Sequence, residues 1–193
     1  MLGEEQSGQI REVGVELYQQ LLEEAVAEAR SGGAAEEQEE ERWTPTINLG
    51  ASILIPDSYV PELNIRLNLY RRLSVLDTRQ EIDAFAAELG DRFGPVPDET
   101  NNLLDVIAIK ALCRKAMIEK VDAGPKGAVL TFRNDQYPNP AGLVQFLTRQ
   151  GAKAKLRPDH KLVLVRDWPK TKSRLNGVAR LTETLAKLAS KSA

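Results

Sequence analysis

Apolar residues recur at helical spacing along most of this chain, and two short regions alternate or break at turn residues instead. The helical pattern predicts helices over residues 10–30, 61–76, 79–93, 97–118, 140–149 and 170–189. The clearest stripe lies within 79–93, where Ile82, Phe85 and Leu89 share one face. A Gly-Pro pair follows and is typical of a helix end.

Extended segments are predicted before and after the helices over residues 61–118. Residues 43–49 alternate between apolar and polar, which predicts a half-buried strand that continues through residues 53–55 to Pro56. Two later apolar runs, centred on residues 121–132 and 153–165, are each interrupted by turn residues and predict hairpins. Together these elements predict an α+β fold, a small, mostly antiparallel sheet with helices packed on it.

Residues 31–42 interrupt the pattern. From 31 to 41 they contain no apolar residue larger than Ala, and all their charges are negative. Such a segment cannot offset the entropy cost of ordering, so we expect a flexible acidic linker. The predicted organisation is therefore a separate N-terminal helical part (1–30), the linker (31–42) and a compact domain (43–193).

Composition indicates a globular protein of the cytoplasm. Hydrophobic residues make up 42% of the 193 residues, enough to form a core, and no apolar run has the length of a membrane span. The acidic start is not typical of a signal peptide. The single cysteine, Cys113, cannot form an internal disulfide, which favours a cytoplasmic location.

The net charge of −2 hides a strong asymmetry between the two ends of the chain. Residues 1–42 have a net charge of −9, and residues 151–193 have a net charge of +8. Four of the basic residues cluster around one predicted hairpin: Lys153, Lys155, Arg157 and Lys161. They could contact phosphates, or form a solvated face that balances acidic partners. Few aromatic residues accompany them, which does not favour stacking on single-stranded nucleic acid.

Catalytic and metal-binding patterns are absent from the sequence. His160 and Cys113 are the only residues of their types, whereas tight transition-metal sites usually need several such ligands. We expect Cys113 to be buried and His160 to be exposed in a turn. Residues 124–127 (GPKG) lack the spacing of a phosphate-binding loop and predict a turn. Glu88 and Asp91 lie on one outward face of a predicted helix. This face is either a solvated acidic face or a docking patch for a basic surface.

Five stretches resemble the C-terminal domain of the bacterial transcription-repair coupling factor family. They are residues 2–10, 55–61, 66–73, 91–97 and 121–127. Each is weak alone, but their order and spacing are specific. The first is similar to the end of a translocation motif shared with RecG-type helicases, and the resemblance implies that Gln6 contacts the motor and that Gly8 belongs to the motif. Glu4 and Glu5 replace the Thr-Arg pair of the RecG type, in keeping with the coupling-factor version.

The resemblance implies a regulatory role without catalysis by this chain itself. The family's domain clamps onto an N-terminal UvrB-like module of the same protein and masks the surface that binds UvrA. RNA polymerase and duplex DNA would be partners only through the full-length translocase, whose motor domains hold ATP and Mg. Glu88 and Asp91 are the expected contacts, with Arg92 positioning them. The alternative is a nucleic-acid-binding module that uses the basic C-terminal segment.

Overall fold

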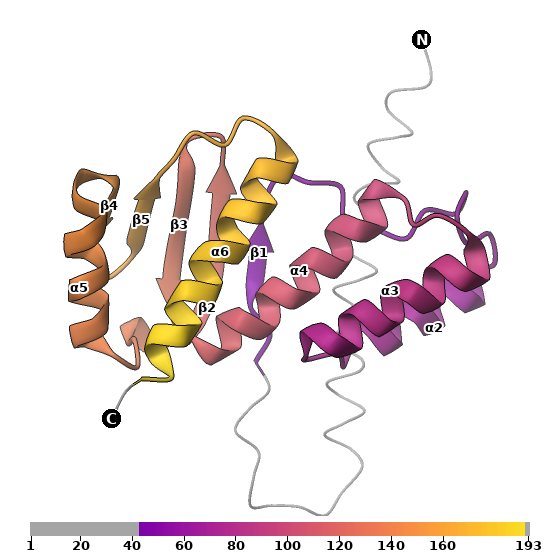
Figure 1. Cartoon of the computed structure of the whole chain (residues 1–193), viewed down its shortest axis with the longest axis horizontal. Coiled ribbons are helices and arrows are strands. Elements are labelled where there is room, and N and C mark those ends of the chain that lie inside the picture. Colours follow the sequence, from indigo (N-terminus) through magenta and orange to yellow (C-terminus); the bar gives the residue numbers. More distant parts are fainter. Residues whose placement is uncertain (1–42, 192–193) are drawn as a thin grey trace, which may run out of the picture. The chain divides into compact units, whose positions relative to one another are not determined.

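A computed structural model describes residues 43–191, which form two compact units (Figure 1). The first unit runs from Ser52 to Ile107, and the second combines Trp43–Ala51 with the residues from Ala108 onward. The predicted helix over 10–30, the linker over 31–42, and Gln6 and Gly8 lie outside the described residues. The three-part organisation of the chain therefore stays a prediction. Between residues 43 and 191, no helix has both the length and the hydrophobicity needed to cross a membrane.

The first unit is built from α2 (Leu63–Ser74), α3 (Arg79–Phe93) and the first part of α4 (Asp98–Lys115). A capping box begins α3, because the Thr78 hydroxyl accepts from the Glu81 N–H and the Glu81 carboxylate accepts from the Thr78 N–H. The fully buried residues come from all three helices and include Leu73, Leu89 and Leu103. These helices confirm the predicted ones, although α4 ends three residues earlier than expected.

The predicted continuation of the first strand through residues 53–55 is wrong. These residues form a loop whose backbone groups bond to helix side chains instead of to a neighbouring strand. The N–H of Ile55 donates to the Tyr70 hydroxyl at 2.7 Å, and the carbonyl of Leu54 accepts from the Thr100 hydroxyl at 3.1 Å. Because a buried backbone group needs a partner of some kind, these side chains replace the strand that the sequence pattern suggested.

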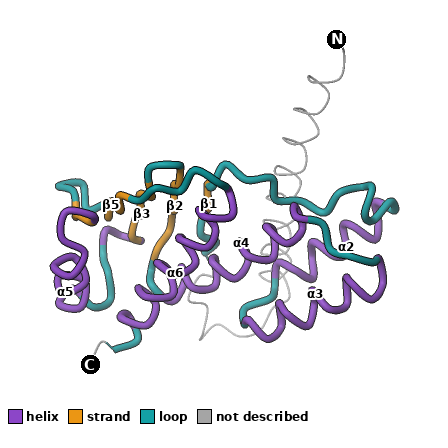
Figure 2. The backbone as a smooth tube through the Cα atoms, turned by 45° about the horizontal axis from the view of Figure 1, so that its top comes forward, coloured by secondary structure: helices purple, strands orange, loops and turns teal. Residues whose placement is uncertain are grey.

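The second unit contains a five-stranded sheet of order β1-β2-β3-β5-β4. Its strands are β1 (Thr46–Asn48), β2 (Ile118–Gly124), β3 (Gly127–Phe132), β4 (Ala154–Leu156) and β5 (Leu162–Val165). Only β1 and β2 pair in parallel, so the predicted α+β fold with a mostly antiparallel sheet is confirmed. The helices α5 (Pro140–Gln150) and α6 (Thr171–Ala189) lie on one face of this sheet (Figure 2).

The GPKG segment is a tight structural turn, as predicted. Gly124 and Gly127 pair across the β2–β3 hairpin. Gly127 has a φ of 129°, and a Cβ there would lie 1.9 Å from the carbonyl oxygen of Leu164 in the neighbouring strand. Only glycine fits this position, because any side chain would collide with the backbone of β5.

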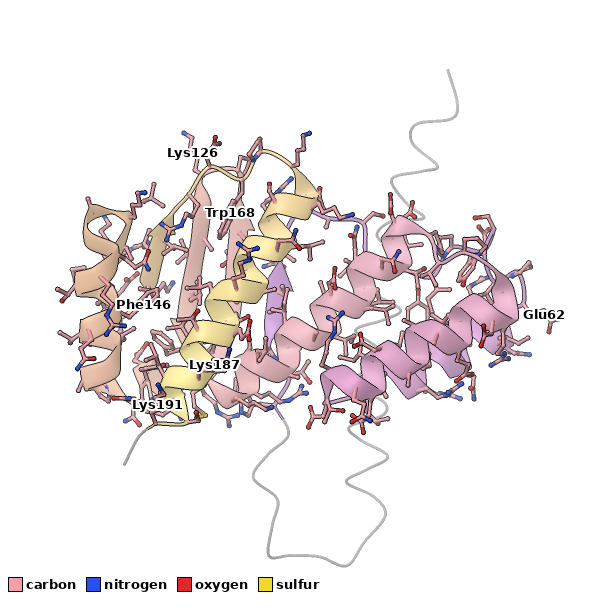
Figure 3. The ribbon with its side chains drawn as sticks, viewed as in Figure 1. Glu62, Lys126, Phe146, Trp168, Lys187 and Lys191 are labelled. Carbon is pink, nitrogen blue, oxygen red and sulfur yellow. The ribbon has the colours of Figure 1, made fainter. Side chains whose placement is uncertain are left out.

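A second close approach fixes the start of α6. Trp168 is buried and lies against α6 near its N-terminal end (Figure 3). A Cβ at Gly177 would lie 2.2 Å from Cζ2 of the Trp168 ring. The glycine therefore lets the indole pack directly against the helix backbone.

Replacing Gly177 with Ala should lower the free energy of unfolding by about 1–3 kcal/mol, because the added methyl group overlaps the indole and forces the packed core to shift. Gly90→Ala is the matched control. Gly90 also lies inside a helix, but no atom lies within 4 Å of the added methyl, so we expect stabilisation by about 0.5–1 kcal/mol. Urea denaturation followed by circular dichroism measures both changes, and similar values for the two variants would contradict the packing described.

Candidate protein-docking site

The C-terminal end of α3 is held in place by Tyr59, in the loop that precedes α2. The Tyr59 hydroxyl lies 2.9 Å from the carbonyl oxygens of both Leu89 and Gly94, at the end of the helix. Its ring packs edge-on against Phe93, with 5.8 Å between ring centroids. The single hydroxyl hydrogen is donated to one of these oxygens at a time or shared between them, and it adds a hydrogen bond at the helix end, where backbone carbonyl groups run out of partners within the helix. The last turn of α3, which carries Asp91, is thereby fixed.

The carboxylate of Glu88 accepts hydrogen bonds from two arginines. Arg72 of α2 donates from Nη1 to Oε1 at 2.7 Å and from Nη2 to Oε2 at 2.5 Å, which is a bidentate ion pair. Arg92, one turn further along α3, donates to Oε1 at 2.9 Å. These hydrogen bonds, first from Arg72 and then from Arg92, lower the pKa of Glu88 to about 2. The Glu88 carboxylate is therefore held in its charged form.

Each arginine also rests on an aromatic ring. The guanidinium carbon of Arg72 lies 4.9 Å from the centroid of Phe85, and that of Arg92 lies 4.9 Å from the centroid of Phe93. A guanidinium at this distance over a ring is attracted to its face. The rings thus restrict the two arginines to the positions from which they reach Glu88.

The structure distinguishes the two acids that the sequence places on one outward face of α3. Asp91 is exposed, and within residues 43–191 its carboxylate forms no ion pair. Glu88 is only 34% exposed and is already paired. Sequence reasoning missed Arg72 because it lies on another helix, sixteen residues away. We call Arg72, Glu88, Asp91 and Arg92 the α3 patch, and Asp91 is its free acid.

The four basic residues predicted to cluster do so on the β4–β5 hairpin. Lys153, Lys155 and Arg157 are exposed, and Lys161 is half-buried. Arg157 forms an ion pair with Asp159 of the turn at 2.9 Å. We call residues 153–161 the basic hairpin. Its arrangement suits either phosphate contact or an acidic protein surface.

Cys113 and His160 lie where the sequence placed them. Cys113 is fully buried, and burial raises the pKa of its thiol to about 12, so it is unreactive near neutral pH. His160 is exposed in the β4–β5 turn. In the described part of the chain, no three His, Cys, Asp or Glu side chains gather as a metal site would require.

Sequence reasoning also missed an apolar groove in the second unit. It has a volume of about 650 Å³ and lies between α5, residues 132–138 and the basic hairpin. Pro140, Val144 and Leu147 of α5 form one wall. Together with the buried Leu143, which also lines the groove, they recur at helical spacing, and this repeat is the signal that could have indicated an apolar face beyond the side that carries Phe146.

A family model for the TRCF domain matches residues 49–143, which include the α3 patch. Residues 49–143 belong to the TRCF domain family. Curated transcription-repair-coupling factors from Rickettsia bellii and Escherichia coli are 46% and 32% identical to it, over 86% and 96% of this chain. The relative from Myxococcus xanthus is 38% identical over 84%. The chain spans only 14%, 16% and 13% of the lengths of these three relatives.

A solved structure supports the assignment of the TRCF fold. The crystal structure of the C-terminal domain of transcription-repair coupling factor superposes with a TM-score of 0.66, covering 79% of this chain and 99% of that one. The sequences are 20% identical in this comparison, so the likeness concerns the fold. The resemblance predicted from the five sequence stretches is confirmed.

The Arg72–Glu88 ion pair predicts a pH dependence of stability. Because the pKa of Glu88 in the folded protein, about 2, lies below the ordinary 4.5, its stabilising contribution is complete above about pH 5 and is lost as the pH falls from 4.5 towards 2. Arg72→Gln should raise the Glu88 pKa towards 4.5 in an NMR titration of the carboxyl group. Arg79→Gln, which removes another exposed guanidinium, should leave it unchanged. A Glu88 pKa near 4.5 in the unaltered chain would show that the ion pair is absent in solution.

Proposed function

We propose that this chain is the C-terminal regulatory region of a transcription-repair coupling factor, an ATP-dependent DNA translocase that displaces stalled RNA polymerase and recruits nucleotide excision repair. In this proposal the region latches onto the N-terminal UvrB-like module and masks its UvrA-binding surface. The observation that supports it most is an exposed, unpaired acid, Asp91, on a fixed patch within the part matched to the TRCF domain. ATP and Mg are assigned to motor domains outside this chain.

The α3 patch has the properties that a reversible latch needs. A latch must favour one of two states by a modest free energy, so its interface has to form and release readily. The side chains of Arg72, Glu88 and Arg92 are already ordered by one another, which reduces the entropy lost on docking. Charge pairs then give orientation and fast association more than raw affinity.

In this proposal the two acids have different roles. A carboxylate offers about four acceptor positions, and Glu88 already uses three of them for its own arginines. A guanidinium of the partner module therefore gains most from Asp91, with Glu88 acting as the support that holds Arg92 nearby. In this proposal Gln6 and Gly8 link the region to the motor, outside the described residues.

Asp91→Lys in the intact coupling factor should raise both the basal ATPase rate and UvrA binding, by about fivefold or more, because a repulsive charge at the latch shifts the equilibrium to the open state. Glu119→Lys is the matched control, since Glu119 is an exposed acid on β2 outside the patch. Glu88→Lys is less suitable, because it also breaks the Arg72 pair. Wild-type values for both activities in a folded Asp91→Lys protein would overturn the assignment.

A nucleic-acid-binding module is the second candidate, favoured by the four basic side chains on the basic hairpin. A mobility shift of this chain with duplex and single-stranded DNA at two salt concentrations separates the candidates. Binding that weakens steeply with salt and is lost on changing Lys153 and Lys155 to Glu would support the second candidate. The latch proposal expects little binding at either concentration.

A further inference from the structure

The apolar groove beside α5, which we call the α5 groove, exposes apolar side chains on both of its walls. Val144 of α5 is 61% exposed, and Leu156 of β4 is 44% exposed. Both line the groove, together with Met117, Phe132 and Tyr137. Phe146, by contrast, lies on the side of α5 that faces the strands (Figure 3). Apolar side chains gathered in an open groove are typical of a surface that another chain covers.

Backbone strain is concentrated at the same place. Among the described residues, four that are not glycine have a positive φ: Met117, Asn134, Asp135 and His160, with values of 55°, 53°, 55° and 60°. Three of them line the groove, and Asn134 adjoins Asp135. Asn, Asp and His adopt a positive φ more readily than other residues that carry a side chain, so Met117 is the clearest strained position. Strained positions cluster where a site must keep a fixed shape for a ligand. This observation is independent of the exposed apolar surface.

The charge beside the groove is positive. Leu156 and His160 line the groove and belong to the basic hairpin. The acid of this hairpin, Asp159, pairs with Arg157, so its net positive charge comes from Lys153, Lys155 and Lys161. Asp135 is the only acid among the lining residues. An occupant with acidic side chains at its edges would therefore be attracted and oriented.

The shape of the groove favours a helix over an extended strand or a small molecule. The neighbouring edge strand, β4, has only three residues, so it offers little backbone for an added strand. Small-molecule sites bring several polar groups together in an enclosed pocket, whereas this groove is open and mostly apolar. An amphipathic helix, by contrast, places apolar anchors in such a groove at positions i, i+3 or i+4, and i+7.

We propose that the α5 groove is a docking site for an acidic amphipathic helix of a partner protein. The apolar face of that helix covers Val144 and Leu156, and its carboxylates face the basic hairpin. The site lies on the second unit, whereas the α3 patch lies on the first, so this proposal does not depend on the latch. It gives the basic hairpin a protein partner in place of a nucleic acid.

A fluorescent synthetic peptide of about four helical turns, with Leu at the anchor positions and Glu on the other face, is the probe. Fluorescence anisotropy with the 193-residue chain should show saturable binding. Leu156→Glu or Val144→Glu should weaken binding by about tenfold or more, because each removes one apolar anchor contact. Val165→Glu is the matched control: Val165 is 53% exposed but lies outside the groove, so binding should be unchanged.

Other results of the same experiment would overturn the proposal. They are the absence of saturable binding, equal binding of a peptide with Lys in place of Glu, or an effect of Val165→Glu as large as that of Leu156→Glu. A further arm of the experiment replaces the peptide with vesicles of anionic lipid. If Leu156→Glu abolishes vesicle binding but leaves peptide binding intact, the groove is a membrane contact instead. Circular dichroism of each variant confirms that a loss of binding is not a loss of fold.

Discussion

The bidentate ion pair between Arg72 and Glu88 ties α2 to α3 and determines which charges the first unit can offer to a partner. As a partly exposed pair it contributes about 1 kcal/mol or less to stability, so the fold depends on the apolar core and not on this contact. Its effect is geometric. The pair occupies the Glu88 carboxylate, to which Arg92 also donates a hydrogen bond. Asp91 remains the free acid of the α3 patch.

The stretches that identify the family are largely the contacts that hold the first unit together. The Tyr59 hydroxyl, from one stretch, donates to the Leu89 carbonyl near the end of α3, and the Tyr70 hydroxyl, from another, accepts a hydrogen bond from the backbone N–H of Ile55. Residues 121–127 form a hairpin that requires glycine. Family membership therefore gives strong support to the fold. The proposed function depends instead on side chains such as Asp91, which forms no ion pair in the described part of the chain.

Local sequence patterns predicted the helices and hairpins well. They did not predict pairings between residues that lie far apart in the sequence. The apolar stripe and the Gly-Pro pair that follows it placed α3 at its observed bounds, because both signals lie within the helix or directly beside it. The parallel pairing of β1 with β2 joins residues 74 positions apart, and no local period reveals it. Residues 53–55 were predicted as a strand because a short apolar run can occur in a strand or in a buried loop. Only the contacts of Tyr70 and Thr100 distinguish the two structures. Likewise, Asp91 was recognised as exposed, whereas the pairing of Glu88 needed the position of α2.

In the proposed latch, the α3 patch, with Asp91 as its free acid, contacts the UvrB-like module. An NMR titration of the labelled chain with the separately prepared module tests it most directly. Shift changes should concentrate at Asp91 and Arg92 and should disappear in the Asp91→Lys variant. Changes confined to residues 153–161, or no changes when the module is in excess, would contradict it.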